Sequence, residues 1–311
     1  MTERRGIRFS GKSLELGKKY LWRRESIPLL YKYLDIHPGQ RIVDVGCGTG
    51  FLSRLVAKAL KGDGAVLGID RNPQLLRYAT RITREAGLDS LVSFQRGDAT
   101  RLELEDNYAE RVICQAVLWT MADPKKAIGE MIRVCKPGGI VGAIEGAFDT
   151  AIFYYPGNEH LSELSSKLVR AQATGIRRLQ GLDGDIGYKL PSLFRDCGLE
   201  RIRLDGYARV WLGEDDRIPL EHKVKLYRNE LDELRRKTSY WIEAFKAGGM
   251  NEDEIREQRD LYSTHLKRLL RKPGYFKADS SVNAGIFLIA TGIKPRDARR
   301  EAPRSTLLRS S

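Results

Sequence analysis

The sequence contains few of the residues that build metal sites and disulfide frameworks. Its 311 residues include four cysteines and four histidines, which are dispersed, and no two cysteines form a Cys-x-x-Cys pair. Structural zinc sites and disulfide frameworks need such clusters, so we expect no metal. Unclustered thiols suit a reducing compartment, and we therefore predict a cytoplasmic location.

Long apolar runs are also missing. No stretch approaches the roughly eighteen apolar residues of a transmembrane helix. The N-terminus is polar and basic, and no apolar stretch follows it, unlike a secretory signal. With 41% hydrophobic residues, the chain has the composition of a globular protein, long enough for one domain with an added layer. We expect no membrane span.

Acidic residues are outnumbered, with 41 Asp and Glu against 54 Lys and Arg, which gives a net charge of +13. Such an excess can bind nucleic acid. However, most of it lies at the ends, because residues 1–25 carry a net +5 and residues 294–311 a net +4. A nucleic-acid partner therefore stays open with weak support, and the basic tail 295–311 is expected to be solvated and flexible.

The most informative feature is the decapeptide Arg-Ile-Val-Asp-Val-Gly-Cys-Gly-Thr-Gly at residues 41–50. Its apolar start predicts a buried parallel strand. Gly46, Gly48 and Gly50 then allow a sharp turn without a Cβ in the way. Apolar residues at helical spacing follow, and a turn between a strand and a helix N-terminus is typical of a nucleotide site.

The spacing excludes two common nucleotide motifs. A dinucleotide fingerprint that starts at Gly46 would need glycine where Phe51 stands, and no lysine is present for a phosphate-binding P-loop. An acid inside the strand, Asp44, would repel a pyrophosphate but could hold an ammonium group. The pattern therefore favours a ligand with a cationic amino-acid end.

Three later segments extend the pattern in order. A second predicted strand ends in Asp70, a third leads into Gly97-Asp98-Ala99, and a Lys-Pro-Gly-Gly turn stands at residues 136–139. Together with residues 41–50 they resemble the class I S-adenosylmethionine-dependent methyltransferases. The resemblance implies S-adenosylmethionine as cofactor and S-adenosylhomocysteine as product. The resemblance implies that Asp70 accepts hydrogen bonds from the ribose hydroxyls of the cofactor and that Asp98 accepts one from its adenine amino group. The full set of cofactor residues that it implies is Asp44, Gly46, Cys47, Gly48, Gly50, Asp70, Arg71, Asp98, Ala99 and Gln115.

The segment after the fourth strand is similar to the small-molecule branch of that family, the ubiquinone/menaquinone C-methyltransferase-like or type 11 methyltransferases. The similarity is carried by Asp123-Pro124 and by Arg133-Val134-Cys135-Lys136-Pro137. It implies a small or medium organic acceptor. Motifs for methylating base amines or cytosine C5 are absent around Cys114, which we interpret as a small buried thiol.

Candidates for the acceptor site come from the strand ends and the segments that cover them. Glu145 follows the fifth strand and is the candidate general base or orienting group; the alternative is that it fixes the adjacent loop. Trp119 stands where relatives often have a histidine, and we predict that it is a wall of the acceptor pocket. The complete predicted pocket is Tyr20, Trp119, Glu145, Tyr154 and Tyr155.

We predict an α/β fold, a doubly wound, seven-stranded Rossmann-like sheet with an antiparallel last strand and helical insertions. Residues 1–38 would form a helical cover, and residues 39–213 and 276–294 the methyltransferase core, with an insertion at 151–181. Residues 214–275 carry a heptad seam and capping signals, which predict a helical hairpin. That seam either packs on its own domain or forms a homodimer contact.

Two other functions stay open at this point. The basic ends are the support for an RNA- or ribosome-associated methyltransferase. A non-catalytic scaffold or regulator that binds S-adenosylmethionine is the alternative of another class.

Overall fold

The computed structural model describes residues 26–236 and 239–296 and six positions of the N-terminal segment: 11, 14, 15, 17, 18 and 22. The predicted pocket residue Tyr20 and all but two residues of the predicted basic tail lie outside the described residues.

A single seven-stranded sheet organises the chain, in the order β3-β2-β1-β4-β5-β7-β6. The first five strands pair in parallel, whereas β7 runs antiparallel to both of its neighbours. This confirms the predicted fold class. The strands are β1 (Arg41–Val45), β2 (Ala65–Asp70), β3 (Val92–Arg96), β4 (Ala109–Gln115), β5 (Cys135–Tyr154), β6 (Glu200–Leu212) and β7 (Val282–Ile293).

Helices cover both faces of the parallel strands, so β1 is buried from Ile42 to Val45. One face packs against α2 (Ile27–Leu34) and α3 (Phe51–Ala59). The other packs against α5 (Pro124–Val134) and α7 (Leu190–Asp196). A fifth helix, α4 (Pro73–Glu85), lies beside β3 near the sheet edge.

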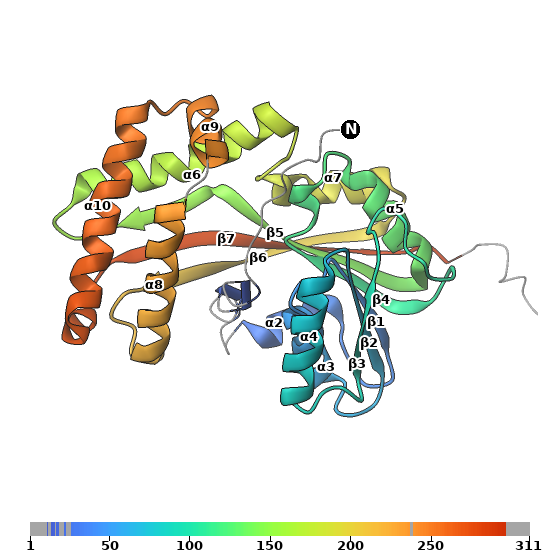
Figure 1. Ribbon diagram of the computed structural model, residues 1–311. Coiled ribbons are helices and arrows are strands. Elements are labelled where there is room, and N and C mark those ends of the chain that lie inside the picture. The colour runs from blue at the N-terminus through green and yellow to red at the C-terminus, as the bar shows by residue number, and fades with distance from the viewer. Residues whose placement is uncertain are drawn as a thin grey trace, which may run out of the picture.

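Strand β5 is much longer than expected. The sequence predicted an insertion from residue 151, but β5 continues to Tyr154. There it pairs with Val282 of β7, which in turn pairs with Leu212 of β6. Figure 1 shows the result, in which β5, β6 and β7 reach well past the ends of the other strands. We call this three-stranded part, residues 146–154, 206–212 and 282–287, the extension.

Four further helices pack around the extension (Figure 1). They are α6 (Glu159–Gln180), α8 (Leu220–Arg236), α9 (Ser239–Ala247) and α10 (Glu252–Arg271). The predicted hairpin corresponds to α8, α9 and α10, and residues 237 and 238 between α8 and α9 lie outside the described residues. The predicted capping signals are confirmed where α10 begins, because Asn251 and Glu254 form a capping box there.

The residues of the heptad seam pack against other helices of the same chain. Tyr227, Leu231 and Leu234 of α8 are buried against α10 and the short helix after it, η3 (Pro273–Ala278). Farther along the seam, Phe245 of α9 packs against α6. The seam residues of both helices therefore contribute to the core around the extension. The homodimer contact stays a prediction.

Within the part of the chain that the structure describes, no helix has both the length and the apolar character that crossing a bilayer requires.

Candidate functional site

The loop between β1 and α3 begins the site. The N–H groups of Gly46 and Cys47 both donate to the Ile69 carbonyl of β2, at 2.7 and 3.0 Å, which fixes the turn to the neighbouring strand. Gly46, Gly48 and Gly50 all have positive φ, near 60–70°. A Cβ on Gly50 would also lie 2.4 Å from the Phe94 ring. Glycine is therefore required here by both backbone and packing.

Asp44 lies beneath this loop and is almost fully buried. Its carboxylate accepts a hydrogen bond from Ser53 Oγ at 2.5 Å. Burial raises its pKa to about 6, although Ser53 and the charge of Lys18 both oppose that rise. Lys18 Nζ lies 3.9 Å from the position that a Cβ on Gly48 would take. The acidic end of β1 thus already accommodates an ammonium group.

Asp70 ends β2 directly beside the same loop. Its two oxygens accept from the N–H groups of Gly48 and Asn72, each at 2.8 Å. The carboxylate is held by these two bonds and is only partly buried, so it keeps capacity to accept further hydrogen bonds. Arg71, the next residue, is exposed. The structure thus brings Asp70 and the glycine turn into one hydrogen-bonded unit.

Asp98 and Ala99 follow β3, the strand next to β2. Thr100 donates to Asp98 Oδ1 from its backbone and its hydroxyl, both at 2.8 Å, and these bonds lower the pKa of Asp98. Asp98 is exposed, whereas Ala99 packs against the buried core. An ionised acceptor therefore stands at the same edge as Asp70.

Several buried polar atoms at this edge have no hydrogen-bond partner among the described residues: Thr49 Oγ1, both amide atoms of Gln115 and Glu145 Oε2. Leaving such atoms unpaired costs about 1–3 kcal/mol each, unless a ligand or water completes the bond. Native sites tolerate that cost where a ligand binds. The residues present therefore fit a polar ligand at the carboxyl ends of β1 and β4, beside Glu145 in the middle of β5.

Glu145 has one oxygen in use and one unpartnered. Glu145 Oε1 accepts from the N–H groups of Val117 and Leu118, at 3.0 and 2.7 Å, and so holds the loop after β4. Complete burial raises the pKa of Glu145 to about 7. The geometry suits the alternative of a loop-fixing residue, while the unpartnered Oε2 leaves the role of base as a prediction.

The other predicted pocket residues fall in different places. Trp119 is half-buried and packs against Phe148, with ring centroids 5.3 Å apart. Tyr154 is 50% exposed, whereas its neighbour Tyr155 is buried next to the His265 ring at 5.0 Å. The structure therefore separates Tyr154 from Tyr155, and it places Trp119 and Tyr155 in two different aromatic clusters.

The N-terminal segment carries contacts that the sequence did not predict. Glu15 forms an ion pair with Arg54 of α3. Trp22 is buried against Tyr207 of β6, with ring centroids 4.8 Å apart. Its contact with Tyr207 shows that it packs on the sheet.

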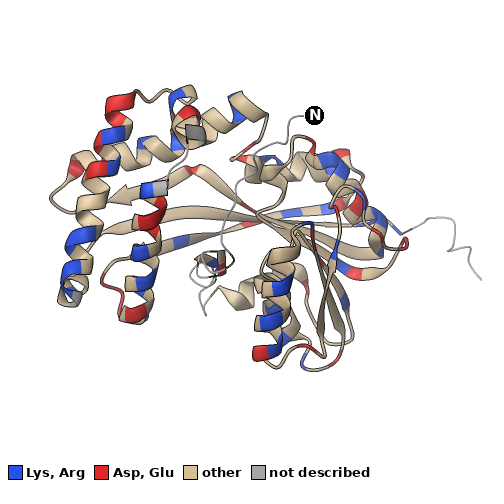
Figure 2. Cartoon of the chain, in the orientation of Figure 1, with Lys and Arg blue, Asp and Glu red and all other residues tan. Residues whose placement is uncertain are grey.

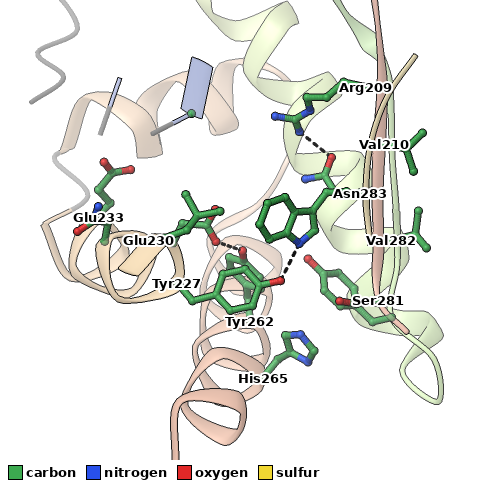
Figure 3. Close-up of a pocket in the computed structure, with 15 residues that line it drawn as sticks. Arg209, Val210, Tyr227, Glu230, Glu233, Tyr262, His265, Ser281, Val282 and Asn283 are labelled. Carbon is green, nitrogen blue, oxygen red and sulfur yellow. Dashed lines mark hydrogen bonds between the residues drawn. The ribbon is translucent and has the colours of Figure 1, made fainter. Parts of the chain in front are cut away.

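A second unpredicted feature is a cavity of about 200 Å³ between the extension and the helices α8 and α10 (Figure 3). Its walls include Arg209 and Trp211 of β6, Tyr227 of α8 and Tyr262 of α10. The alternation Tyr207, Arg209, Trp211 was the available signal, since alternate strand residues share a face.

Charges of both signs are interspersed over the helices around that cavity (Figure 2). Among the described residues of α8 and α10, neither helix is of one sign. The same residues contain no group of three or more His, Cys, Asp or Glu side chains placed to hold a metal ion.

Comparison with known proteins gives a consistent result. A methyltransferase domain model matches residues 36–182. The demethylmenaquinone methyltransferase of Bacillus cytotoxicus is 30% identical over 202 residues, which cover 62% of this chain and 83% of that protein. The ubiquinone/menaquinone biosynthesis C-methyltransferase of Bdellovibrio bacteriovorus is 35% identical over 132 residues, 42% of this chain. The chain spans only about half the length of the latter, 53%.

Among solved structures, the YcgJ protein of Bacillus subtilis is similar in fold. It has a TM-score of 0.52 at 17% sequence identity, over 88% of this chain and 100% of that chain.

Proposed function

This chain belongs to the class I S-adenosylmethionine-dependent methyltransferases, and from that premise we propose that it transfers the donor's methyl group to a small or medium organic acceptor. The observation that carries the proposal is the unit formed by Asp44, the glycine turn and Asp70. It offers acids for an ammonium group and for hydroxyls, at a turn that leaves no side chain in the way.

When bound, S-adenosylmethionine supplies a methyl group on a good sulfonium leaving group. The residues have separate tasks in holding it. Asp44 balances an ammonium charge, Asp70 accepts from ribose hydroxyls, and Asp98 accepts from an adenine amino group. Gln115 and Thr49 offer the unpartnered polar atoms that a bound ligand would complete. Alignment and exclusion of water are then the chain's main contributions to the rate.

Glu145 is our candidate for accepting a proton from the acceptor. Two loop N–H groups position one carboxylate oxygen, which leaves the other free to face an acceptor. A pKa of about 7 is well matched to a general base near neutral pH. Trp119, on the loop that Glu145 fixes, would form a wall of the same site.

A small-molecule acceptor is supported by the names of the relatives, one of which is a C-methyltransferase of ubiquinone/menaquinone biosynthesis. The interspersed charges of the described helices offer no separate support for an RNA substrate. The cytoplasmic location and a homodimer remain proposals as well. The location is supported by four free thiols, three of them buried.

The test is a radiolabelled cofactor assay on extract fractions. The chain is titrated calorimetrically with S-adenosylmethionine and then incubated with methyl-labelled cofactor and separated small-molecule, RNA and protein fractions. We expect binding, and label in the small-molecule fraction. Label in RNA would favour the RNA alternative, binding without transfer would favour the scaffold, and no binding would refute the proposal.

A further inference from the structure

One face of the extension is apolar and exposed to solvent. Directly paired residues of neighbouring strands lie on the same side of a sheet, as do alternate residues of one strand. The register therefore places six side chains on this face, which we call the open face: Ile152 and Tyr154 of β5, Ala284 and Ile286 of β7, and Ala208 and Val210 of β6. The four largest of them are 38–61% exposed. Figure 3 shows Val210 pointing away from the cavity on the other side of the strands.

The covered face of the same strands is the more polar one. It carries Arg209 and Asn283, which line the cavity between the extension and the helices α8 and α10. A sheet with one solvated face normally places its polar residues on that face. Here the alternation is reversed, since the open face has no charged residue and its one polar side-chain group is the Tyr154 hydroxyl. Such a pattern is typical of a face that another apolar surface covers.

The open face begins where the short helix η2 (Ile186–Lys189) stops covering the sheet. A Cβ on Gly187 of η2 would lie 3.1 Å from Leu288 Cδ1, so η2 packs on the sheet at that residue. Leu288 pairs with Glu145 of β5, and Ile286 lies two residues away on the same strand. The open face is therefore on the same side of the sheet as Glu145, beyond the residues that we propose for the acceptor.

The size of the open face limits how strongly it can bind. Three strands spaced by about 4.8 Å, with seven residues of about 3.3 Å each, give a flat area of roughly 300 Å². The largest apolar patch on a monomer is typically about 300–600 Å² and often functional. Two such faces that covered each other would bury roughly 600–1,200 Å² in total, which is the size of a weak, reversible interface.

The chemistry of the open face favours a second copy of the chain over other partners. A nucleic acid or an anionic membrane is held by basic side chains, and the open face has none. In a two-fold dimer each copy presents the same surface, so an uncharged face meets no like charge. Two stacked sheets also interdigitate their side chains at a separation of about 10 Å. The heptad seam is not available for this contact, because Tyr227 and Leu231 of α8 are buried within the chain.

We propose that the chain forms a weak, two-fold homodimer in which the open faces of two copies pack against each other. The contact involves none of the cofactor residues, so this inference goes beyond the proposed function. We expect a dissociation constant of about 10–100 µM, because an interface of this size is small for a stable dimer.

The test is sedimentation velocity of the full chain over a series from about 1 to 300 µM, which spans the dissociation constant expected for so small an interface. The wild type should pass from monomer to dimer within this series. Added salt should tighten the dimer, because screening reduces the repulsion between two chains of net charge +13 while the apolar contact remains. A chain that stays monomeric throughout, or a dimer that salt dissociates, would overturn the inference.

Two charged substitutions localise the contact. Ile152→Lys and Ala208→Lys change exposed residues on different strands of the open face. Each should raise the dissociation constant at least about tenfold, since an uncompensated charge would be buried in the dimer. Leu29→Lys is the control, because Leu29 is exposed on α2, which covers the opposite side of the sheet. A dimer that survives both substitutions in variants with wild-type circular dichroism, or one that Leu29→Lys weakens equally, would contradict the proposed contact.

Uncharged phosphatidylcholine vesicles test another occupant of an apolar face, a lipid surface. The wild type should not co-sediment with them. Co-sedimentation that Ile152→Lys abolishes would replace the homodimer by a membrane contact. Failure of the methyltransferase proposal is recognised separately, because it appears as a lack of S-adenosylmethionine binding whatever the association state of the chain.

Discussion

The parallel part of the sheet and the extension build binding sites in opposite ways. In the parallel part, backbone groups and small residues form the site, as in the turn at Gly46–Gly50. In the extension, large side chains such as Trp211 and Tyr227 form the cavity walls. A site formed by backbone groups keeps its geometry when side chains are substituted, and it therefore suits one fixed ligand. A cavity walled by side chains changes its shape with each substitution.

The largest effect is expected from a substitution that destabilises the helices around the extension and leaves the cofactor edge unchanged. A Cβ on Gly175 of α6 would lie 1.7 Å from the Ala244 carbonyl oxygen of α9. Since the obstacle is backbone, Gly175→Ala should lower the free energy of unfolding by about 3 kcal/mol or more. Affinity for S-adenosylhomocysteine should change less than about twofold, because the cofactor edge is made by other elements. Urea denaturation and calorimetry measure the two quantities.

Gly129→Ala is the matched control for that change. Gly129 lies in α5, where an added Cβ meets nothing within 4 Å. Alanine there should raise the free energy of unfolding by about 0.5–1 kcal/mol. If Gly175→Ala proves equally harmless, the close approach of α6 and α9 is not as described.

The next largest effect is a pH dependence at Glu145, where the two parts meet. Its pKa is raised from 4.5 to about 7, so between those values the folded chain holds a proton that the unfolded chain has lost. Wild-type stability therefore falls as pH rises through this window, and Glu145→Gln removes that loss. The stability of the variant relative to wild type should rise by about 2–3 kcal/mol from pH 5 to pH 8, measured by urea denaturation.

Glu110→Gln is the control for pH. Glu110 lies at the opposite end of β4, and its bond to Lys136 helps to lower the pKa of Glu110. It is ionised in both states above about pH 5, so its substitution should have the same effect at pH 5 and pH 8. A flat difference for Glu145→Gln as well would contradict the assigned direction of its shift.

Asp70→Asn tests the cofactor edge directly. The amide keeps the shape but loses the charge that accepts from Gly48 and Asn72. We expect the affinity for S-adenosylhomocysteine to fall about thirtyfold, or about 2 kcal/mol. Asp89→Asn, in an exposed position before β3, should leave calorimetric binding unchanged. Unchanged binding by Asp70→Asn would remove the ribose assignment.

The smallest effect is expected from Tyr227→Phe in the cavity wall. The change removes the acceptor of Trp211 Nε1 while it keeps the stacked ring. The free energy of unfolding should fall by about 1 kcal/mol, with no change in cofactor affinity. A loss of cofactor affinity would show that the two sites are less separate than the comparison holds.

The sequence predicted the parallel part well because its signals are local. The acid and glycines of residues 44–50 act through backbone geometry within seven residues, and the next two acids each end or follow a strand. The extension depends on pairings between residues far apart in the chain. The register shift between Ala147 and Ile152 breaks the alternation of β5, which no sequence pattern announces.

The same reason explains the residues that were grouped wrongly or missed. Tyr154 and Tyr155 were predicted together, although Tyr154 is the last residue of β5 and exposed, whereas Tyr155 follows the strand and is buried. Arg209 resembles a solvent-facing residue until α8 and α10 close over it. Glu145 was predicted to follow a strand, but it lies inside β5, which continues to Tyr154. Its two loop bonds depend on residues that are 27 and 28 positions away.

The point at which α8, α9 and α10 join the sheet has a consequence for how such a chain can change. They leave after Leu212 and return at Val282, two residues paired in adjacent strands. The ends of this segment are therefore about one strand spacing apart, roughly 5 Å, so loops of very different length can close there at little extra entropic cost. Evolution or an engineer can exchange residues 213–281 as one cassette, with the register of β5 and the donor site left intact.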